Sequence, residues 1–500
     1  MSGQSSFNSQ KKSFVKLNIN SFIWDKLGLF LLLFSGIFTT VLLGGFQFVH
    51  LPLWWKKTFG SLFKKEVKIS GKDAISPFGS LCTSLAASVG VGNIVGVSTA
   101  ICMGGAGAVL WMWVAAVLGM GTSYAENVLG IYFRRKNING EWSGGPMYYL
   151  SEGLGSKKGC KTLGRLLARL FSLFTVFASF GIGSMGQVNK IVINLTSAFP
   201  LVGLNEISVF DKFELYPFIL GVFLFVLASV VSLGNIKHIS SFTEKIVPFM
   251  IMFFLSGSLF VIIKNRGNII PAFKAVFSSA LSFKAGLGGT SGAALAQMVS
   301  QGFKRGAFSN EAGLGSTVIV HSSSSLKEPC EQGMWGMFEV FTDTIVICSV
   351  TALVVMTSGA YNLSDNSFLG NDATLVATSF NINLPGQNIG GKFVAFCIFM
   401  FSFTTIIGWN HYGAKAWEYM FGERSVFLFK ILHLASVPLG AVLPSYLAWE
   451  ISDIFNGLMM IPNLIAVISL SGLVKKISRN YILRKKKGKN IKPMLSYFIK

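Results

Sequence analysis

Residues 86–96 read AASVGVGNIVG and interrupt a stretch, 77–103, that is otherwise long and apolar enough to cross a lipid bilayer. Three glycines and Asn93 therefore fall at the depth where an unpaired backbone amide costs most. Secondary transporters use such breaks to bind a substrate carboxylate through amides and Na⁺ through carbonyls. Close packing of small residues between helices is the alternative explanation, and this stretch alone does not choose between the two.

The composition is that of a polytopic membrane protein. Of 500 residues, 51% are hydrophobic and 13% are charged, against about 25% charged in an average soluble protein. The net charge of +22 lies in the connections between apolar runs, as the positive-inside rule predicts. We therefore expect the lipid bilayer as the partner of the basic residues, and no nucleic acid. The sequence indicates no obligate protein partner and no disulfide framework.

Hydropathy predicts an all-α protein with eleven transmembrane helices. A tail at 1–23 precedes a transmembrane domain at 24–475, and a basic tail follows at 476–500. The first apolar run is long enough to span, so we interpret it as a retained helix and not as a signal peptide. The predicted spans are 24–50, 77–103, 106–133, 166–198, 215–233, 241–263, 278–303, 333–358, 391–416, 425–447 and 452–474.

Basic connections give the predicted orientation. The connection at 51–73 carries many lysines and few acids, so we place it in the cytoplasm. Alternation then places the other strongly basic segments inside as well: 134–161, 237–245, the stretch after 304–305, 415–424 and the C-terminal tail. The N-terminus is predicted to be outside the plasma membrane and the C-terminus in the cytoplasm. Ten or twelve spans would leave the basic C-terminal cluster outside.

A second glycine-rich run, GLGGTSG at 286–292, lies in span 278–303, five spans after the first. The two spans start from opposite sides of the membrane. Interrupted helices at corresponding positions of two halves are typical of an inverted repeat with a binding site at the midplane. We therefore predict repeats at 77–263 and 278–474, with 24–50 as an added helix.

Two further spans offer polar side chains. Thr404 and Thr405 are adjacent hydroxyls, and a hard cation such as Na⁺ prefers oxygen ligands. The alternative is that each hydroxyl donates to the carbonyl one turn back. Gln187 and Asn189 follow a glycine-rich run that would let a ligand approach, or they form hydrogen bonds between helices.

Five stretches in order resemble one family. They are GVGNIVGVSTAI (90–101), GGAGAVLWMWVAAVLG (104–119), GGPMYYL (144–150), RGAFSNEAGLGS (305–316) and TTIIGW (404–409). The similarity covers roughly residues 25–475 and is to the bacterial and archaeal sodium:alanine (or glycine) symporters. It implies the fold of the bacterial leucine transporter, a 5+5 inverted repeat, here preceded by one extra helix. It also implies Na⁺-driven uptake of a small neutral amino acid, alanine or glycine first.

The same resemblance assigns site residues. The Ala86 and Val89 carbonyls with the Thr404 and Thr405 hydroxyls would bind the co-transported Na⁺, and Ser88 and Asn93 align with a second sodium site. The substrate would contact the amides of Ser88, Val89 and Gly90, and the residues Gly183, Gln187, Gly289 and Thr290.

Three residues depart from the family pattern. Leu110 stands where the signature usually has Phe, and Val91 stands where Thr is frequent. Thr290 aligns where alanine-selective members tend to have Phe. A smaller, polar residue there would enlarge the pocket, which makes glutamine or serine an alternative substrate to alanine.

The sequence also contains residues that could serve proton coupling or an enzyme. Glu339 and Asp343 lie one turn apart in span 333–358, so proton coupling is the rival to Na⁺ coupling, and a structural pair is the alternative. An enzyme is disfavoured because Ser309 lacks the frame of a nucleophile elbow, although His321 is near in sequence. A channel would need symmetric rings of charges or carbonyls. Glu311, in a segment predicted to be cytoplasmic, is a candidate gate residue or helix cap.

Overall fold

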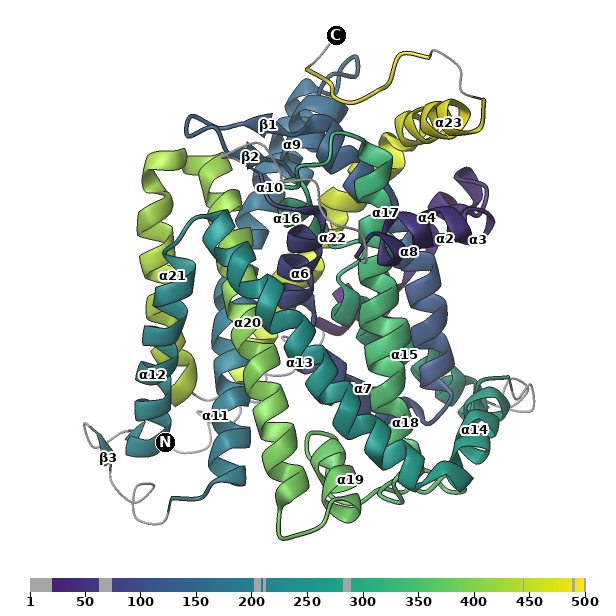
Figure 1. Cartoon of the computed structure of the whole chain (residues 1–500), viewed down its shortest axis with the longest axis vertical. Coiled ribbons are helices and arrows are strands. Elements are labelled where there is room, and N and C mark those ends of the chain that lie inside the picture. The colour runs from purple at the N-terminus through teal and green to yellow at the C-terminus, as the bar shows by residue number, and fades with distance from the viewer. Residues whose placement is uncertain are drawn as a thin grey trace.

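Long α-helices make up almost all of the structure, which is a computed structural model that describes residues 20–62, 74–201, 208–209, 213–281, 289–443, 445–487 and 491–498 (Figure 1). Two short antiparallel strand pairs lie in the connections. In the first, β1 (Arg135–Lys136) pairs with β2 (Trp142–Ser143), and in the second, β3 (Ser208–Val209) pairs with β4 (Phe213–Glu214).

The first half of the chain contains the following helices, where η marks π- or 3₁₀-helical segments: η1 (Phe22–Gly28), α2 (Leu29–Leu42), α3 (Phe46–Val49), α4 (Leu51–Lys57), α5 (Phe59–Leu62), α6 (Pro77–Ser88), η2 (Gly92–Gly96), α7 (Val97–Gly104), α8 (Ala108–Phe133), α9 (Pro146–Tyr148), η3 (Tyr149–Leu154), α10 (Lys161–Phe180), η4 (Gly181–Met185), α11 (Gly186–Ala198), α12 (Leu215–Ser232) and α13 (Ile236–Lys264).

The second half contains η5 (Arg266–Asn268), α14 (Ile269–Leu281), α15 (Gly289–Asn310), α16 (Thr317–His321), α17 (Pro329–Val340), η7 (Phe341–Cys348), α18 (Ser349–Thr357), α19 (Leu375–Asn383), α20 (Ile389–Phe421), η8 (Glu423–Ser425), α21 (Val426–Val442), α22 (Ser445–Ser469) and α23 (Ser471–Lys487).

Local sequence explains where key helices begin and end. Ser76 caps α6 by accepting a hydrogen bond from the Gly79 amide, and Pro77 occupies the first helical position. Asn235 caps α13 in the same way. α20 ends at Gly422, whose φ of +81° suits glycine.

Among the described residues, eight helices are long and apolar enough to cross a membrane, or ten if each of two bent pairs is one span. The bent pairs are Pro77–Ser88 with Gly92–Gly104, and Asp453–Ser469 with Ser471–Lys485. Large apolar side chains such as Phe30, Val230 and Phe427 are exposed on the perimeter. An apolar perimeter of this kind suits hydrocarbon, so the prediction of an all-α membrane protein agrees with the structure, while the count of eleven spans stays a prediction.

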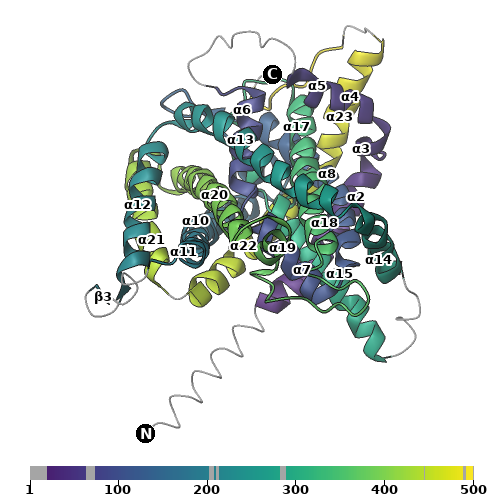
Figure 2. The ribbon, with the colours of Figure 1, turned by 60° about the horizontal axis from the view of Figure 1, so that its bottom comes forward.

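The connections separate to two ends of the bundle. In Figure 1, β1, β2, α9 and α23 lie at one end, and β3, α14 and α19 lie at the other. We name the first the basic end, because connections rich in Lys and Arg gather there. Figure 2 shows α12 and α21 side by side at one margin, where their apolar side chains pack with those of α11 and α20.

One predicted helix end differs from the structure. The span predicted at 278–303 ends before Lys304 and Arg305, but α15 continues through Asn310. Lys304 lies 3.6 Å from Asp25 of η1, so it forms an ion pair with the N-terminal helix. The residues that follow α15 are buried.

Candidate substrate and sodium site

The first predicted break is present. α6 ends at Ser88, and the chain turns by 61° before it continues as α7. The Gly90 amide donates to Oδ1 of Asn93 at 2.9 Å, and not to the carbonyl of Ala86 four residues earlier. The Asn93 amide donates to the Gly90 carbonyl at 3.3 Å, and not to that of Val89. The carbonyls of Ala86 and Val89 therefore lose the donors that a continuous helix would provide.

Two neighbouring helices bring side chains to this break. A Cβ added to Gly90 would lie 2.9 Å from Oγ1 of Thr405 and 3.6 Å from Oε1 of Gln187, so glycine lets both reach the backbone. The hydroxyls of Thr404 and Thr405 each donate to the carbonyl of Phe401 at 2.9 Å. This is the bond one turn back expected as the alternative, but it leaves the lone pairs of both hydroxyl oxygens able to bind a cation.

Two buried polar atoms beside the break have no hydrogen-bond partner among the described residues. They are Oγ of Ser88 and Oε1 of Gln187. Nε2 of Gln187 donates to the carbonyl of Ile182 at 3.1 Å, which holds the side chain in place. Buried polar groups are usually satisfied, so this donor and this acceptor are candidates for contact with a ligand.

Two of the backbone amides predicted to bind the substrate carboxylate have partners within the protein in this conformation, so their contact with substrate stays a prediction. The Val89 amide donates to the carbonyl of Leu85 at 2.8 Å, and the Gly90 amide is taken by Asn93. The Asn93 side chain accepts from Gly90 and donates to Asp343, so both of its polar atoms have partners within the protein. The Ser88 hydroxyl has none among the described residues, so it is the polar group of this break that is open to a ligand.

A second break lies at residues 311–316, between α15 and α16, and not within the described part of the run at 286–292. Between α15 and α16 the chain leaves the helix at Glu311, whose φ is +55°, and Gly313 and Gly315 also have positive φ values of +88° and +80°. Glu311 is only 4% exposed. This segment, predicted to be cytoplasmic, is therefore a buried interruption of a helix, and the side of the membrane on which it lies stays a prediction.

Glu311 connects the second break to its neighbours. Nε1 of Trp409, on α20, donates to Oε1 of Glu311 at 3.2 Å, and Oγ of Ser316 donates to Oε2. A Cβ on Gly183 of η4 would overlap the side chain of Trp409, so the tryptophan lies directly against that π-helical turn. Trp409 thus joins the second break to the helix that carries Gln187.

The break predicted at 286–292 is not where the second interruption lies. Residues 282–288 are outside the described residues, and α15 runs unbroken from Gly289 to Asn310. At 1.5 Å per residue, Gly289 and Thr290 lie about 30 Å along the helix from Asn310. Glycines are also compatible with the start of a helix. The assignment of Gly289 and Thr290 to the substrate site stays a prediction.

Asp343 of η7 joins the two interrupted helices. Its carboxylate accepts from Nδ2 of Asn93 at 2.7 Å and from the hydroxyl of Ser309, the penultimate residue of α15, at 2.7 Å. The Thr344 hydroxyl adds a third donor at 2.9 Å. Ser309 and Asp343 had no place in the predicted sodium or substrate site.

Glu339, one turn earlier, makes the corresponding contacts to the other half of each broken helix, α6 and α16. It accepts from the Ser84 hydroxyl of α6 and lies 2.8 Å from Nε2 of His321 at the end of α16. Nε2 of Gln332 in turn faces Nδ1 of His321. Both acids therefore contact partners on both broken helices, which is the arrangement expected of a structural pair. Proton coupling through them is not tested by these contacts.

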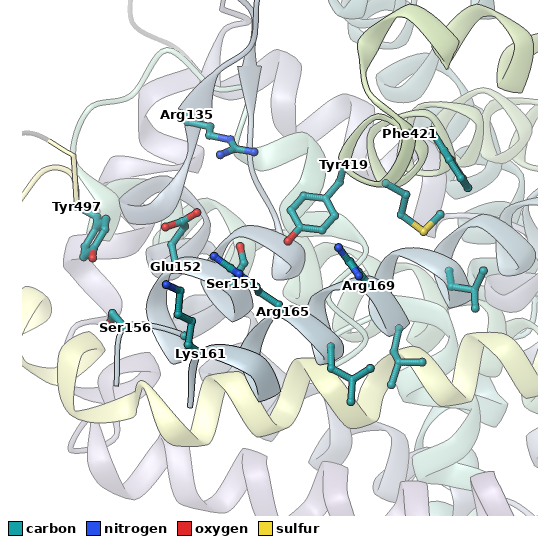
Figure 3. A pocket seen from close by; sticks show the side chains of 15 residues that line it. Arg135, Ser151, Glu152, Ser156, Lys161, Arg165, Arg169, Tyr419, Phe421 and Tyr497 are labelled. Carbon is teal, nitrogen blue, oxygen red and sulfur yellow. The ribbon is translucent and has the colours of Figure 1, made fainter. Parts of the chain in front are cut away.

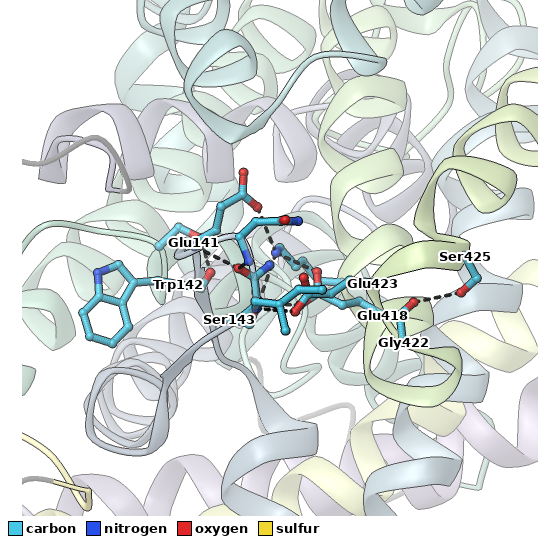
Figure 4. A network of polar contacts seen from close by, with 12 residues as sticks. Glu141, Trp142, Ser143, Glu418, Gly422, Glu423 and Ser425 are labelled. Atoms are coloured by element: carbon cyan, nitrogen blue, oxygen red, sulfur yellow. Dashed lines mark hydrogen bonds and ion pairs between the residues drawn. The ribbon is translucent and has the colours of Figure 1, made fainter.

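Hydrogen bonds beyond the site fix the basic end of α20. The Lys415 ammonium lies 2.8 Å from the Glu418 carboxylate and 3.4 Å from Glu141, which follows β1 (Figure 4). The Ser143 hydroxyl of β2 donates to Glu418 at 2.6 Å. The β1–β2 hairpin is thereby held against the helix that carries Thr404 and Thr405.

Known proteins resemble this chain over nearly its whole length. The model of the sodium:alanine symporter family matches residues 9–494. The sodium/alanine symporter AgcS of Methanococcus maripaludis is 40% identical over 473 residues, which is 94% of this chain and 98% of that protein. The probable sodium/glutamine symporter GlnT of Bacillus subtilis is 33% identical over 94% of this chain and 91% of that protein.

Among solved structures, MhsT in complex with L-phenylalanine matches with a TM-score of 0.48 and 12% identity, over 82% of this chain and 99% of that chain. The sequence matches carry the assignment. The chain belongs to the sodium:alanine symporter family, and it is a multi-pass membrane protein of a family of transporters.

Proposed function

We propose that this protein is a sodium-coupled symporter that imports a small neutral amino acid, alanine or glycine first, by alternating access. One observation carries the proposal: the Ala86 and Val89 carbonyls lose their helical donors at the point where Gly90 meets Thr405 and Gln187. Freed carbonyls, hydroxyl oxygens and open polar side chains at a helix break are how secondary transporters bind an ion and a substrate together.

The ion is assigned to the oxygen atoms between α6 and α20. The carbonyls of Ala86 and Val89 and the hydroxyls of Thr404 and Thr405 give a neutral set of oxygen ligands. The carbonyl of Phe401 accepts from both hydroxyls and so directs their lone pairs away from itself. Such a set suits a monovalent hard cation, since it adds no negative charge. Ser88 and Asn93 are the candidates for a second sodium ion.

The substrate is assigned to the open polar atoms beside the ion. The Ser88 hydroxyl can donate to the carboxylate of an amino acid, and Oε1 of Gln187 can accept from its ammonium group. Gly183, packed on Trp409, forms the wall behind. Thr290 lies too far along α15 to set the size of this pocket. A competition experiment, and not the identity of residue 290, will therefore show which of alanine, glycine, serine and glutamine is the preferred substrate.

The fold that supports this function is a 5+5 inverted repeat after one added helix. Five helices follow in each half: α6–α7, α8, α10–α11, α12 and α13, then α15–α16, α17–α18, α20, α21 and α22. The positive-inside rule places the basic end in the cytoplasm and the N-terminus outside.

The test is uptake by purified protein in liposomes with an imposed Na⁺ gradient, competed against all twenty amino acids. Each Na⁺ that enters down 100 mV contributes about 2.3 kcal/mol, enough for roughly 50-fold accumulation of substrate. Uptake without Na⁺ that follows a pH gradient would replace Na⁺ coupling by proton coupling, with Glu339 and Asp343 as the groups to examine. Flux that does not saturate and ignores both ions would exclude a symporter.

A further inference from the structure

A cavity of about 720 Å³ lies at the basic end, away from the candidate transport site. It is bounded by η3, the first turns of α10 and the end of α20 (Figure 3). Four basic side chains and one acidic side chain line it: Arg135, Lys161, Arg165, Arg169 and Glu152. A hollow with this excess of positive charge favours an anion.

Three of the basic side chains are unpaired. Lys161, Arg165 and Arg169 are spaced four residues apart, so they lie on one face of α10. Within the ranges that the structure describes, none of the three forms an ion pair or a hydrogen bond. Arg135 lies over the Tyr148 ring, 4.8 Å from its centre, and lines the same cavity. Lys161, Arg165 and Arg169 are exposed, so water screens their mutual repulsion, and a bound anion would offset the repulsion that remains.

The other wall of the cavity is apolar and continues onto the outer surface. Leu166, Leu170 and Leu173 of α10 face Met420 and Phe421 of α20. Leu166, Leu173 and Phe421 are also exposed on the perimeter of the bundle. A ligand with an anionic group at one end and hydrocarbon at the other would contact both walls, whereas a small soluble anion would contact only the first.

Helix length and charge favour a position of the cavity near the lipid headgroups. The continuous helix Lys161–Ala198 has 38 residues. At 1.5 Å per residue this is roughly 57 Å, longer than the 40–45 Å of a bilayer with its headgroups, so the helix extends out of the hydrocarbon. Since Lys161 and Arg165 lie in its first turns, we expect this end of the helix to lie in the interface at the basic end.

We propose that this cavity binds an anionic glycerophospholipid, with the phosphate on Arg165 and Arg169 and the acyl chains along the leucines of α10. The headgroup hydroxyls lie toward Glu152, and Tyr419, whose hydroxyl points toward the arginines in Figure 3, adds a donor or acceptor. Basic pockets at the interface between transmembrane helices are suited to such headgroups. The ligand binds at the junction of η3, α10 and α20, and so holds elements of both halves of the chain together.

The test compares lipid binding by full-length protein in detergent, measured by native mass spectrometry. Palmitoyl-oleoyl phosphatidylglycerol is titrated against the matching phosphatidylcholine, and glycerol 3-phosphate and inorganic phosphate are titrated separately. The variants are R165Q/R169Q and the matched control K56Q/K476Q, which removes two exposed lysines at the same end that line none of the described cavities.

Wild type and the control are expected to retain phosphatidylglycerol in preference to phosphatidylcholine. R165Q/R169Q is expected to bind phosphatidylglycerol about 30-fold more weakly, since two basic contacts are lost. A preference unchanged in R165Q/R169Q, or lost equally in the control, would overturn the proposal. Binding of the soluble phosphates as tight as that of the lipid would replace the lipid by a free anion.

Discussion

The side-chain amide of Asn93 donates to the carboxylate of Asp343 at 2.7 Å, while its oxygen accepts from the amide of Gly90 at 2.9 Å. One side chain therefore stabilises the first helix break and fixes it to a helix outside the break. Substitution of either residue should change the geometry of the break, even where no ligand contact is lost.

Asp343→Ala is expected to abolish most substrate uptake. It removes the carboxylate acceptor of the Asn93 amide and the Ser309 hydroxyl, and leaves these buried donors only longer contacts to the Asp343 carbonyl and the Cys348 sulfur. Loss of a hydrogen bond to a charged group costs about 1.5–3 kcal/mol. Uptake in liposomes and the melting temperature of the purified protein measure the effect. Asp365→Ala, in an exposed loop, should leave both unchanged. Normal uptake by the Asp343 variant would contradict the role of this carboxylate in positioning the breaks.

Thr404→Val with Thr405→Val should remove the dependence of transport on Na⁺, because valine keeps the shape of threonine and deletes the cation ligand. Both hydroxyls bond only within α20 and to sulfur, so the double variant should still fold and reach the membrane. Uptake at varied Na⁺ concentration, with the protein quantified in the membrane, is the measurement. Full stimulation by Na⁺ in this variant would refute the site.

Gly90→Ala should reduce uptake by about tenfold to 100-fold, because small displacements of binding groups are costly. The new methyl group would lie 2.9 Å from Oγ1 of Thr405 and must move the hydroxyl or the break. Gly267→Ala is the control, since a Cβ there meets no atom within 4 Å. Equal uptake by the two variants would show that close approach at Gly90 is unnecessary.

Gln187 and Thr290 are expected to differ in their effect on transport. Gln187→Leu deletes the open acceptor for the ammonium group, and loss of a charged hydrogen bond of about 1.5–3 kcal/mol raises the KM for the amino acid.

Thr290→Phe should leave the ratio of alanine to glutamine uptake unchanged, since Thr290 lies about 30 Å along α15 from the second break. A changed ratio in the Thr290 variant would support the sequence-based prediction that Thr290 sets the size of the substrate pocket.

The first break was predictable and the second was not, for physical reasons. Glycines at 90 and 92 lie within an apolar run, so an interruption of a spanning helix was the natural interpretation, and hydroxyls at 404 and 405 stood out against apolar neighbours. Of the glycine run at 286–292, the part that the structure describes, from Gly289 on, belongs to α15. The second break, at Glu311, lies in a polar stretch, and a polar stretch between apolar runs resembles a connection. The sequence does not reveal that the Glu311 carboxylate accepts hydrogen bonds from Ser316 and Trp409 inside the protein.

The long-range contacts of the two acids were also beyond the sequence. That Glu339 and Asp343 lie one turn apart follows from their spacing, but which partners they contact depends on how four separate segments pack. Position along the chain gave no sign that Ser84 and His321 would meet one acid, and Asn93 and Ser309 the other.

Together, Glu339 and Asp343 contact all four half-helices. This arrangement bears on leak, which is the passage of ions through the protein without substrate. α17, η7 and α18 form one continuous 29-residue span. If the halves on one side swing away, one carboxylate loses its partners. If both sides opened together, two buried carboxylates would be unpartnered at once, and the costs would add. We therefore expect the state open on both sides, in which ions could pass freely, to be the least stable. The two side chains that join the half-helices would then also oppose movement of the ion without the substrate.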